Sequence, residues 1–194
     1  MGTGKKDPPP FERHGRKLIG ENTRFRIYFD HIVARDQVAV PEYLVVVPKL
    51  QTRDGITGVG ILPVLGDKIV LLKIYRHPVE TWSWEIPRGF VDSDEGALES
   101  VARELNEETG LRCSKNKIQE LGCIDADAGI LSARIKLFAG LDCEVERPFA
   151  PDEMGHLEMK TFEVREVFDL IGKSEMRDPS SLVAFYRYTN MING

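Results

Sequence analysis

Apolar residues form short runs along the chain, and Gly, Pro and Asp separate these runs. Residues 24–33 and 42–47 are rich in aromatic and β-branched side chains, which is typical of strands. The stretches 57–65 and 68–75 are also apolar, and Gly66 with the following Asp lies between them. This arrangement predicts a β-hairpin that turns at Gly66.

The second half of the chain continues the alternation of strands and helices. Trp82, Trp84 and Ile86 alternate with polar residues, which predicts a short strand with one packed face. Further strands are expected over 118–125, 132–141 and 159–163, and helices over 165–171 and from Pro179, capped by Asp178, through 186. We found no internal repeat. Strands interleaved with two or three helices predict a mixed sheet covered by helices.

One stretch predicts an amphipathic helix. Its apolar side chains recur at helical spacing, at Leu98, Val101, Ala102 and Leu105. Asp92 is expected to cap the helix, because Glu95 follows three residues later as in a capping box. Gly110 is expected to end it.

Three carboxylates line one edge of this helix. At about 100° per residue, Glu104, Glu107 and Glu108 fall within an arc of roughly 100° beside the apolar stripe. Like charges at this spacing repel one another, so their crowding suggests a bound divalent cation. Arg103 lies one turn before Glu107 and can pair with it. The alternative is a solvated acidic helix face.

Composition limits the other functional classes. The chain has 194 residues, which favours one domain with an added subdomain. Its net charge of −5 does not suggest a general nucleic-acid or membrane-surface role. The three cysteines show no CxxC spacing and predict no disulfide framework. With no signal peptide and no membrane-spanning run, a cytoplasmic protein is expected.

The helix also carries a family motif. Gly89, five residues, Glu95, seven residues and then Arg-Glu-Leu-Asn-Glu-Glu-Thr-Gly-Leu, ending at Leu111, match the Nudix box at every defining position. The chain therefore resembles the Nudix hydrolases. The segments 75–78 and 84–89 resemble the approach to the box in ADP-ribose pyrophosphatases and related nucleoside-diphosphate-sugar hydrolases. This similarity covers most of the chain from about Lys17.

The resemblance implies a fold and a domain organisation. The expected fold class is α/β (α+β): a Nudix α/β/α sandwich with a mixed sheet and a small N-terminal β-subdomain. We expect a flexible lead-in over 1–16, the β-subdomain over 17–55 and the Nudix domain over 56–194. In this branch the subdomain often exchanges across a homodimer, so a homodimer is expected.

The resemblance also implies the reaction and its metal. A Mg²⁺-dependent enzyme would hydrolyse ADP-ribose to AMP and ribose 5-phosphate, with Mn²⁺ as an alternative ion. Glu104 and Glu108 are expected to bind the metal, with Glu107 as a shared or outer ligand, and the backbone carbonyl of Arg88 is a further ligand. Arg103 is expected to orient these carboxylates.

Other site residues lie outside the helix. Glu153 is the expected general base, because it lies in a later loop, and Glu158 is the second choice. Arg76 is expected to bind a substrate phosphate, and Arg134 is a further substrate-binding candidate. Trp82 and Trp84 are candidates for stacking on the substrate, although two tryptophans here also suit a core.

One loop departs from the family pattern. Where ADP-ribose hydrolases usually carry proline and an acidic residue after the box, this chain has Ala128 and Ala133. A different substrate therefore stays open, such as GDP-mannose, NADH or a dinucleotide. A catalytically silent nucleotide sensor is a further alternative, but such domains usually lose box glutamates.

Overall fold

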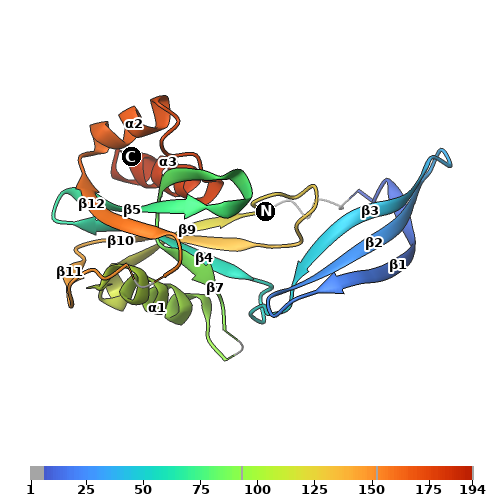
Figure 1. Cartoon of the computed structure of the whole chain (residues 1–194), viewed down its shortest axis with the longest axis horizontal. Coiled ribbons are helices and arrows are strands. Elements are labelled where there is room, and N and C mark those ends of the chain that lie inside the picture. Colours follow the sequence, from blue (N-terminus) through green and yellow to red (C-terminus); the bar gives the residue numbers. More distant parts are fainter. Residues whose placement is uncertain (1–6, 93, 152, 194) are drawn as a thin grey trace. The chain divides into compact units, whose positions relative to one another are not determined.

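The computed structural model describes residues 7–92, 94–151 and 153–193 (Figure 1). The chain divides into two compact units: Met1–Lys49 with Asp127–Ser132, and Leu50–Ala126 with Ala133–Gly194. Residues 1–6 of the expected lead-in, and Ser93 within the family motif, lie outside the described residues.

The first unit is built on a three-stranded antiparallel sheet in the order β1-β2-β3. Its strands are β1 (Phe11–Glu21), β2 (Phe25–Ala34) and β3 (Ala39–Pro48). The predicted strands correspond to β2 and β3. The prediction of a lead-in through residue 16 was wrong, because β1 begins at Phe11. Charged and glycine residues on this exposed strand hide its pattern in the sequence.

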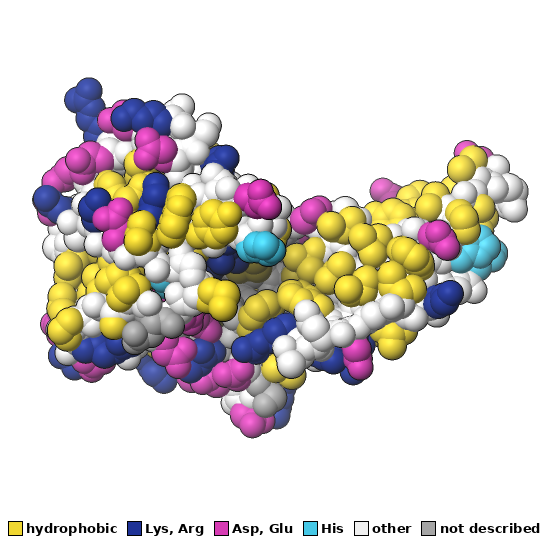
Figure 2. Space-filling view, in the orientation of Figure 1, with side chains coloured by type: hydrophobic (Ala, Val, Ile, Leu, Met, Phe, Trp, Pro, Cys, Tyr) yellow, Lys and Arg dark blue, Asp and Glu magenta, His cyan; other side chains and the backbone are white. Residues whose placement is uncertain are grey.

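This sheet has little core of its own. Of its three strands, only Asp30 and Pro48 are buried. Figure 2 shows apolar side chains gathered over the three strands, and the exposed large apolar residues include Leu18, Val40 and Leu44. The carboxylate of Asp30 is held by two hydrogen bonds of 2.7 Å from the guanidinium of Arg16, which link β1 to β2.

The second unit is built around a seven-stranded mixed sheet with the path β12-β5-β4-β10-β9, to which β6 and β7 add through β5 and β4. Its strands are β4 (Gly58–Leu65), β5 (Lys68–Arg76), β6 (Thr81–Glu85), β7 (Arg88–Phe90), β9 (Ile118–Ile124), β10 (Ile135–Gly140) and β12 (His156–Phe162). A small separate pair joins β8 (Leu111–Arg112) to β11 (Glu144–Val145). Short 3₁₀ turns η1 (His77–Val79) and η2 (Lys115–Lys117) complete the connections. The pair β4–β10 is parallel, so the sheet is mixed as predicted.

Helices cover both faces of this sheet (Figure 1). The helix α1 (Ala97–Thr109) packs on β4 and β7, α2 (Val164–Gly172) packs on β12, and α3 (Pro179–Asn193) packs on β4, β10 and β9. Side chains of β4 therefore alternate between two cores: Ile61 belongs to the α1 side and Leu62 to the α3 side. A strand that is covered on both faces reads as a continuous apolar run, which explains the pattern of residues 57–65.

Most predicted elements are confirmed, including the hairpin β4–β5, the box helix and a last helix with Asp178 before it. The Asp178 carboxylate accepts a hydrogen bond of 2.9 Å from the Ser181 amide, as an N-cap should. The predicted start of the box helix was wrong. Its N-cap is Gly96, without a side-chain bond, because Asp92 and Glu95 lie in the preceding loop.

Candidate active site

The acidic edge of α1 is partly buried. Glu104 and Glu108 lie one turn apart and are only 7% and 5% exposed. The Glu107 side chain, by contrast, is 52% exposed. The apolar stripe fixes this orientation, because Val101 and Leu105 are completely buried in the core below. Two of the three predicted carboxylate ligands therefore lie where water cannot screen their charge.

Arg103 connects the loop, β7 and the acidic edge. Its Nη1 donates to Glu104 Oε1 at 2.8 Å and to Glu107 Oε2 at 2.9 Å. Its Nη2 donates to the carbonyl oxygen of Phe90 at 3.1 Å, and its Nε donates to Glu95 at 3.2 Å. A guanidinium with this many partners is held in one position, so it can orient the carboxylates that it contacts.

The strand β7 approaches α1 closely enough for backbone contact. The amide of Arg88 donates to Glu108 Oε2 at 3.0 Å. A Cβ atom on Gly89 would overlap the carboxylate of Glu104. Glycine at this position therefore leaves the space that the Glu104 carboxylate occupies. The carbonyl of Arg88, a predicted ligand, belongs to the same strand.

The buried carboxyl groups have raised pKa values. Burial, with the nearby carboxylates of Glu153 and Glu104, raises the pKa of Glu108 to about 8. Burial also raises the pKa of Glu104, although the ion pair with Arg103 opposes this shift. Both shifts mean that negative charge is costly here when no cation is present. Functional sites commonly gather groups with such shifted pKa values.

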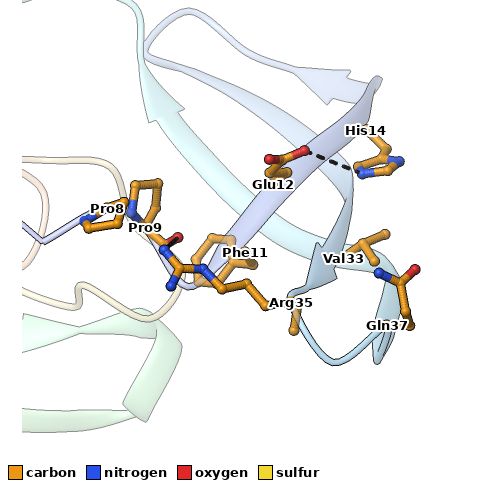
Figure 3. A pocket seen from close by; sticks show the side chains of 9 residues that line it. Pro8, Pro9, Phe11, Glu12, His14, Val33, Arg35 and Gln37 are labelled. Carbon is orange, nitrogen blue, oxygen red and sulfur yellow. Dashed lines mark hydrogen bonds and ion pairs between the residues drawn. The ribbon is translucent and has the colours of Figure 1, made fainter.

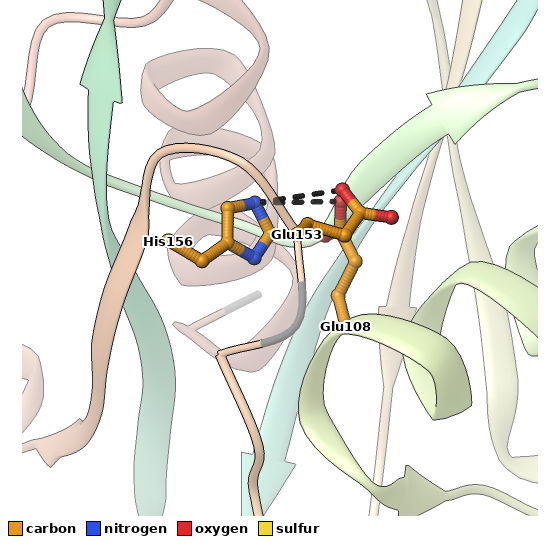
Figure 4. Close-up of side chains that lie close together, drawn as sticks. All are labelled: Glu108, Glu153 and His156. Atoms are coloured by element: carbon orange, nitrogen blue, oxygen red, sulfur yellow. Dashed lines mark ion pairs between the residues drawn. The ribbon is translucent and has the colours of Figure 1, made fainter.

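Two further residues face the acidic edge of α1 (Figure 4). They are Glu153, in the loop before β12, and His156, the first residue of β12. His156 Nε2 lies 3.9 Å from Glu108 Oε1 and 3.8 Å from Glu153 Oε2. The His156 side chain is only 5% exposed, and its burial lowers its pKa. Sequence reasoning missed His156. Its one signal was its place three residues after Glu153 in the loop that was expected to supply the base.

These groups suit a divalent cation. One ligand atom from each of Glu108, Glu153 and His156 lies within 4.8 Å of the other two. Carboxylate oxygens and imidazole nitrogens are the usual protein ligands of divalent ions. A cation would also offset the like charges that raise the pKa of Glu108. The residues therefore fit a divalent cation on chemical grounds.

The structure separates the two candidates for the base. Glu153 lies in the cluster described above, and its charge acts on both Glu104 and Glu108. Glu158 lies on β12, where its carboxylate pairs with Lys160 at 2.8 Å. Glu158 is not part of the cluster of possible ligands found among the described residues.

Arg76 is bound to a buried carboxylate that sequence reasoning missed. Its Nη2 lies 2.6 Å from Glu85 Oε2, and Glu85 is only 2% exposed. The side chain of Arg88 lies 3.3 Å from the same oxygen and 3.1 Å from Asp178. With Arg177, these residues line a hollow of about 300 Å³. The signal for Glu85 was an acidic residue between the apolar Trp84 and Ile86.

The remaining substrate-binding candidates differ in exposure. Trp84 is 5% exposed and packs edge to face on Phe162, so the prediction that it stacks on substrate was wrong. Trp82 is 41% exposed and contacts the ring of Tyr75. Arg134 has a side chain that is 56% exposed, 3.7 Å from Asp125. The structure does not bring Arg134 into the cluster at Glu108.

A second hollow, of about 350 Å³, lies on the first unit beside β1 and β2 (Figure 3). Its lining includes Phe11, Arg35 and His14. Its carboxylate, Glu12, is 3.9 Å from His14 and has a side chain that is 87% exposed. An exposed ion pair of this kind has little effect on either group. We therefore place the candidate active site in the second unit.

Comparison with known protein families matches residues 56–182 to the NUDIX domain. A search of curated proteins finds similar segments in several relatives, three of which are the following. ADP-ribose pyrophosphatase of Saccharomyces cerevisiae is 42% identical over 62 residues, which cover 29% of this chain and 27% of the relative. ADP-sugar pyrophosphatase of Mus musculus is 32% identical over 84 residues, covering 40% and 38%.

The third relative is CMP-5'-(N-acetyl-N-hydroxy-3-aminopropyl)phosphonate hydrolase of Streptomyces rubellomurinus, 40% identical over 57 residues, covering 28% of each chain. The chain thus spans less than half the length of each of these relatives. A crystal structure of an ADP compounds hydrolase superposes with a TM-score of 0.79 at 17% identity, covering 98% of both chains. This likeness shows the fold. None of the described helices combines the length and hydropathy that crossing a bilayer requires.

Proposed function

The chain belongs to the NUDIX domain family, and from this premise we propose that it is a metal-dependent pyrophosphohydrolase. Its proposed substrate is ADP-ribose or a related nucleoside diphosphate sugar, and its proposed location is the cytoplasm. The observation that carries this proposal is the buried pair Glu104 and Glu108, facing Glu153 across the site. The similarity to ADP-ribose and ADP-sugar pyrophosphatases supports the choice of substrate class.

Mg²⁺ is the proposed ion, and Mn²⁺ the alternative. Glu104, Glu108 and the carbonyl of Arg88 would hold it, with Glu107 at the exposed side. When bound, a divalent cation supplies positive charge that offsets the charge of the diphosphate. Arg103 holds the carboxylates of Glu104 and Glu107 in place for this task.

Glu153 is the proposed general base. It takes a proton from the water that attacks one phosphorus of the diphosphate, and the bond from this phosphorus to the bridging oxygen breaks. With ADP-ribose, the products are AMP and ribose 5-phosphate. Of the two candidates, Glu153 is favoured because it shares the cluster with Glu108 and His156, whereas Glu158 pairs with Lys160.

Arg76 is the proposed phosphate contact. Glu85 binds its Nε and Nη2, so the guanidinium is fixed while Nη1 has no hydrogen bond within the described part of the chain. A fixed guanidinium can donate to a phosphate oxygen with little loss of entropy. Trp82, which is exposed, is the proposed stacking residue, and Arg134 is a further proposed contact.

We further propose that the first unit supports a homodimer. A three-stranded sheet needs an apolar face covered to be stable, yet two buried residues are all that its strands contain. Exposed apolar residues such as Leu18 and Leu44 offer surface for a second copy. The proposed boundaries are a β-subdomain that ends near residue 55 and a catalytic domain from residue 56.

The loop after the box favours a second candidate substrate. Ala128 and Ala133 stand where ADP-ribose hydrolases usually carry proline and an acidic residue. A different nucleoside diphosphate derivative, such as GDP-mannose, NADH or a dinucleotide, is therefore the alternative. A silent sensor is not favoured, because Glu104, Glu107 and Glu108 are all present.

Product analysis tests the proposal. The full chain is incubated with ADP-ribose, GDP-mannose, UDP-glucose or NADH, with and without Mg²⁺, and the products are separated by chromatography. We expect AMP and ribose 5-phosphate from ADP-ribose, with metal only. Turnover of a different compound would move the substrate to the alternative. Metal binding without turnover of any compound would contradict the enzymatic proposal.

A further inference from the structure

We infer that His156 is a nitrogen ligand of the cation site, and that this site binds a transition ion such as Co²⁺ through it. The inference rests on the proposed metal site, but it concerns a residue outside the box helix. It assigns to the site a mixed set of ligands, in which an imidazole joins the carboxylate oxygens. Glu153 keeps its proposed role as the base.

The position of the His156 ring suits a metal ligand. Nε2 of His156 faces Glu108 Oε1 at 3.9 Å and Glu153 Oε2 at 3.8 Å (Figure 4). Both distances are too long for hydrogen bonds. Two ligands of one ion, each about 2.1 Å from it, stand about 3 Å apart at a right angle. The observed separations therefore leave space that a cation between Nε2 and the Glu108 carboxylate would fill after small side-chain movements.

The ring has little contact with solvent and lies beside two carboxylates. The His156 side chain is 5% exposed, and it makes no hydrogen bond with the described residues that meets the usual distance limits. An imidazole that is directed at two carboxylates but bonded to neither is a group for which a bound ion would provide the partner.

The backbone around His156 holds the ring in this place. The amide of His156 donates to the carbonyl oxygen of Glu153 at 3.1 Å. The amide of Tyr75 donates to the carbonyl oxygen of Gly155 at 2.8 Å. Gly155 has φ of +94°, and a Cβ there would come within 2.9 Å of the Tyr75 carbonyl oxygen. The tight turn before β12 therefore requires glycine, and it presents the next side chain to the acidic edge.

An imidazole ligand changes which metal ions the site prefers. Mg²⁺ prefers oxygen ligands, whereas imidazole suits transition ions, whose affinities rise from Mn²⁺ through Co²⁺ and Ni²⁺ to Cu²⁺. Carboxylates alone would also bind Co²⁺ more tightly than Mg²⁺. The specific expectation is therefore a difference: removal of the imidazole should weaken Co²⁺ binding strongly and Mg²⁺ binding little.

Calorimetry and NMR of the full-length protein test this inference. Co²⁺ and Mg²⁺ are titrated into the wild type, into His156→Gln and His156→Phe, and into His77→Asn as a control on an exposed histidine. We expect both His156 variants to lose at least tenfold in Co²⁺ affinity and less than threefold in Mg²⁺ affinity. The control should match the wild type. His156→Gln keeps a polar side chain, so it serves if the phenylalanine variant does not fold.

Proton NMR of the Co²⁺ form identifies the ligand directly. A histidine bound to Co²⁺ gives a strongly shifted N–H resonance that disappears in D₂O. We expect this resonance in the wild type and in His77→Asn, and its loss in His156→Gln. Co²⁺ binding without the resonance, or equal losses for both ions, would overturn this inference alone. Failure to bind either ion would overturn it together with the proposed function.

Discussion

Gly89 lies so close to Glu104 that a single methyl group on Gly89 would overlap the Glu104 carboxylate. The contact joins β7 to α1, and the two elements are also joined through Arg103, which binds both Glu104 and the Phe90 carbonyl. The spacing of glycine and glutamates in the sequence thus has a steric meaning. The glycine leaves room for a carboxylate that must be buried and still face the site.

Replacement of Gly89 by alanine should damage the site more than the fold. The new methyl group would clash with the carboxylate of Glu104, which is the end of a flexible side chain. Glu104 can therefore change its rotamer while the backbone keeps its conformation. We expect Gly89→Ala to weaken Mg²⁺ binding at least tenfold, measured by calorimetry. Gly172→Ala is the matched control, because a Cβ there meets nothing within 4 Å. Equal metal affinity in both variants would contradict the steric role of Gly89.

Glu153→Gln should lower turnover at least a hundredfold, in line with the usual contribution of a general base. The change keeps size and shape, so the thermal midpoint should move little. Glu158→Gln is the control, since Glu158 pairs with Lys160 on β12. We expect its kcat to stay within threefold of the wild type. Both rates are measured with the substrate identified by product analysis. A larger loss in Glu158→Gln than in Glu153→Gln would exchange the two roles.

The sequence predicted the parts of this protein that have a local pattern. The apolar stripe of Val101 and Leu105 placed the box helix, and the motif placed Glu104 and Glu108 on its inner edge. The central strands were readable because both of their faces are buried. The start of the box helix could not be predicted, because its N-cap residue, Gly96, has no side chain for capping.

Contacts between distant segments could not be predicted. His156 meets Glu108 only because β12 pairs with β5, and no spacing in the chain encodes this pairing. Arg76 was expected to bind phosphate, but the buried Glu85 that fixes its guanidinium was not predicted. Trp84 was a candidate for stacking, although two tryptophans there also suited a core, and its packing on Phe162 decided for the core. In each case tertiary packing determined the role of a side chain whose chemistry was already visible.

Asp30→Asn should destabilise the first unit at neutral pH. Hydrogen bonds from Arg16 hold the pKa of Asp30 below its usual value, although burial opposes this. When folding lowers the pKa of a carboxyl group, that group stabilises the protein at pH values above its pKa in the unfolded chain. This stabilisation is lost as the pH falls through the pKa that the group has in the folded protein. We expect a loss of about 1.5–3 kcal/mol at pH 7, as for a hydrogen bond to a charged group.

The Asp30 effect is best followed by hydrogen exchange of β1 and β2 amides, because unfolding of the whole chain need not report on this sheet. The difference between variant and wild type should shrink as the pH is lowered below about 4. Asp36→Asn, at the exposed turn between β2 and β3, is the control. A difference that stays constant from pH 7 to pH 3 would show that the charge of Asp30 is not involved.

Glu108→Gln should abolish metal-dependent turnover and yet stabilise the metal-free protein at high pH. Burial, with Glu153 and Glu104 nearby, raises the pKa of Glu108 from 4.5 to about 8. The unfolded chain thus releases this proton near pH 4.5, whereas the folded protein keeps it until about pH 8. Folding stability from this group is therefore complete below pH 4.5 and is lost as the pH rises towards 8.

Glutamine has no proton to lose, so the variant should avoid this loss. In chelator-treated protein, denaturant unfolding should give the same stability for both forms near pH 4.5 and a more stable variant at pH 8. The amide can still accept the hydrogen bond from the Arg88 backbone, which now binds Glu108 at 3.0 Å. A variant that is less stable than the wild type at pH 8 would mean that the carboxylate is favourable without metal. Full turnover with Mg²⁺ would remove Glu108 from the proposed ligands.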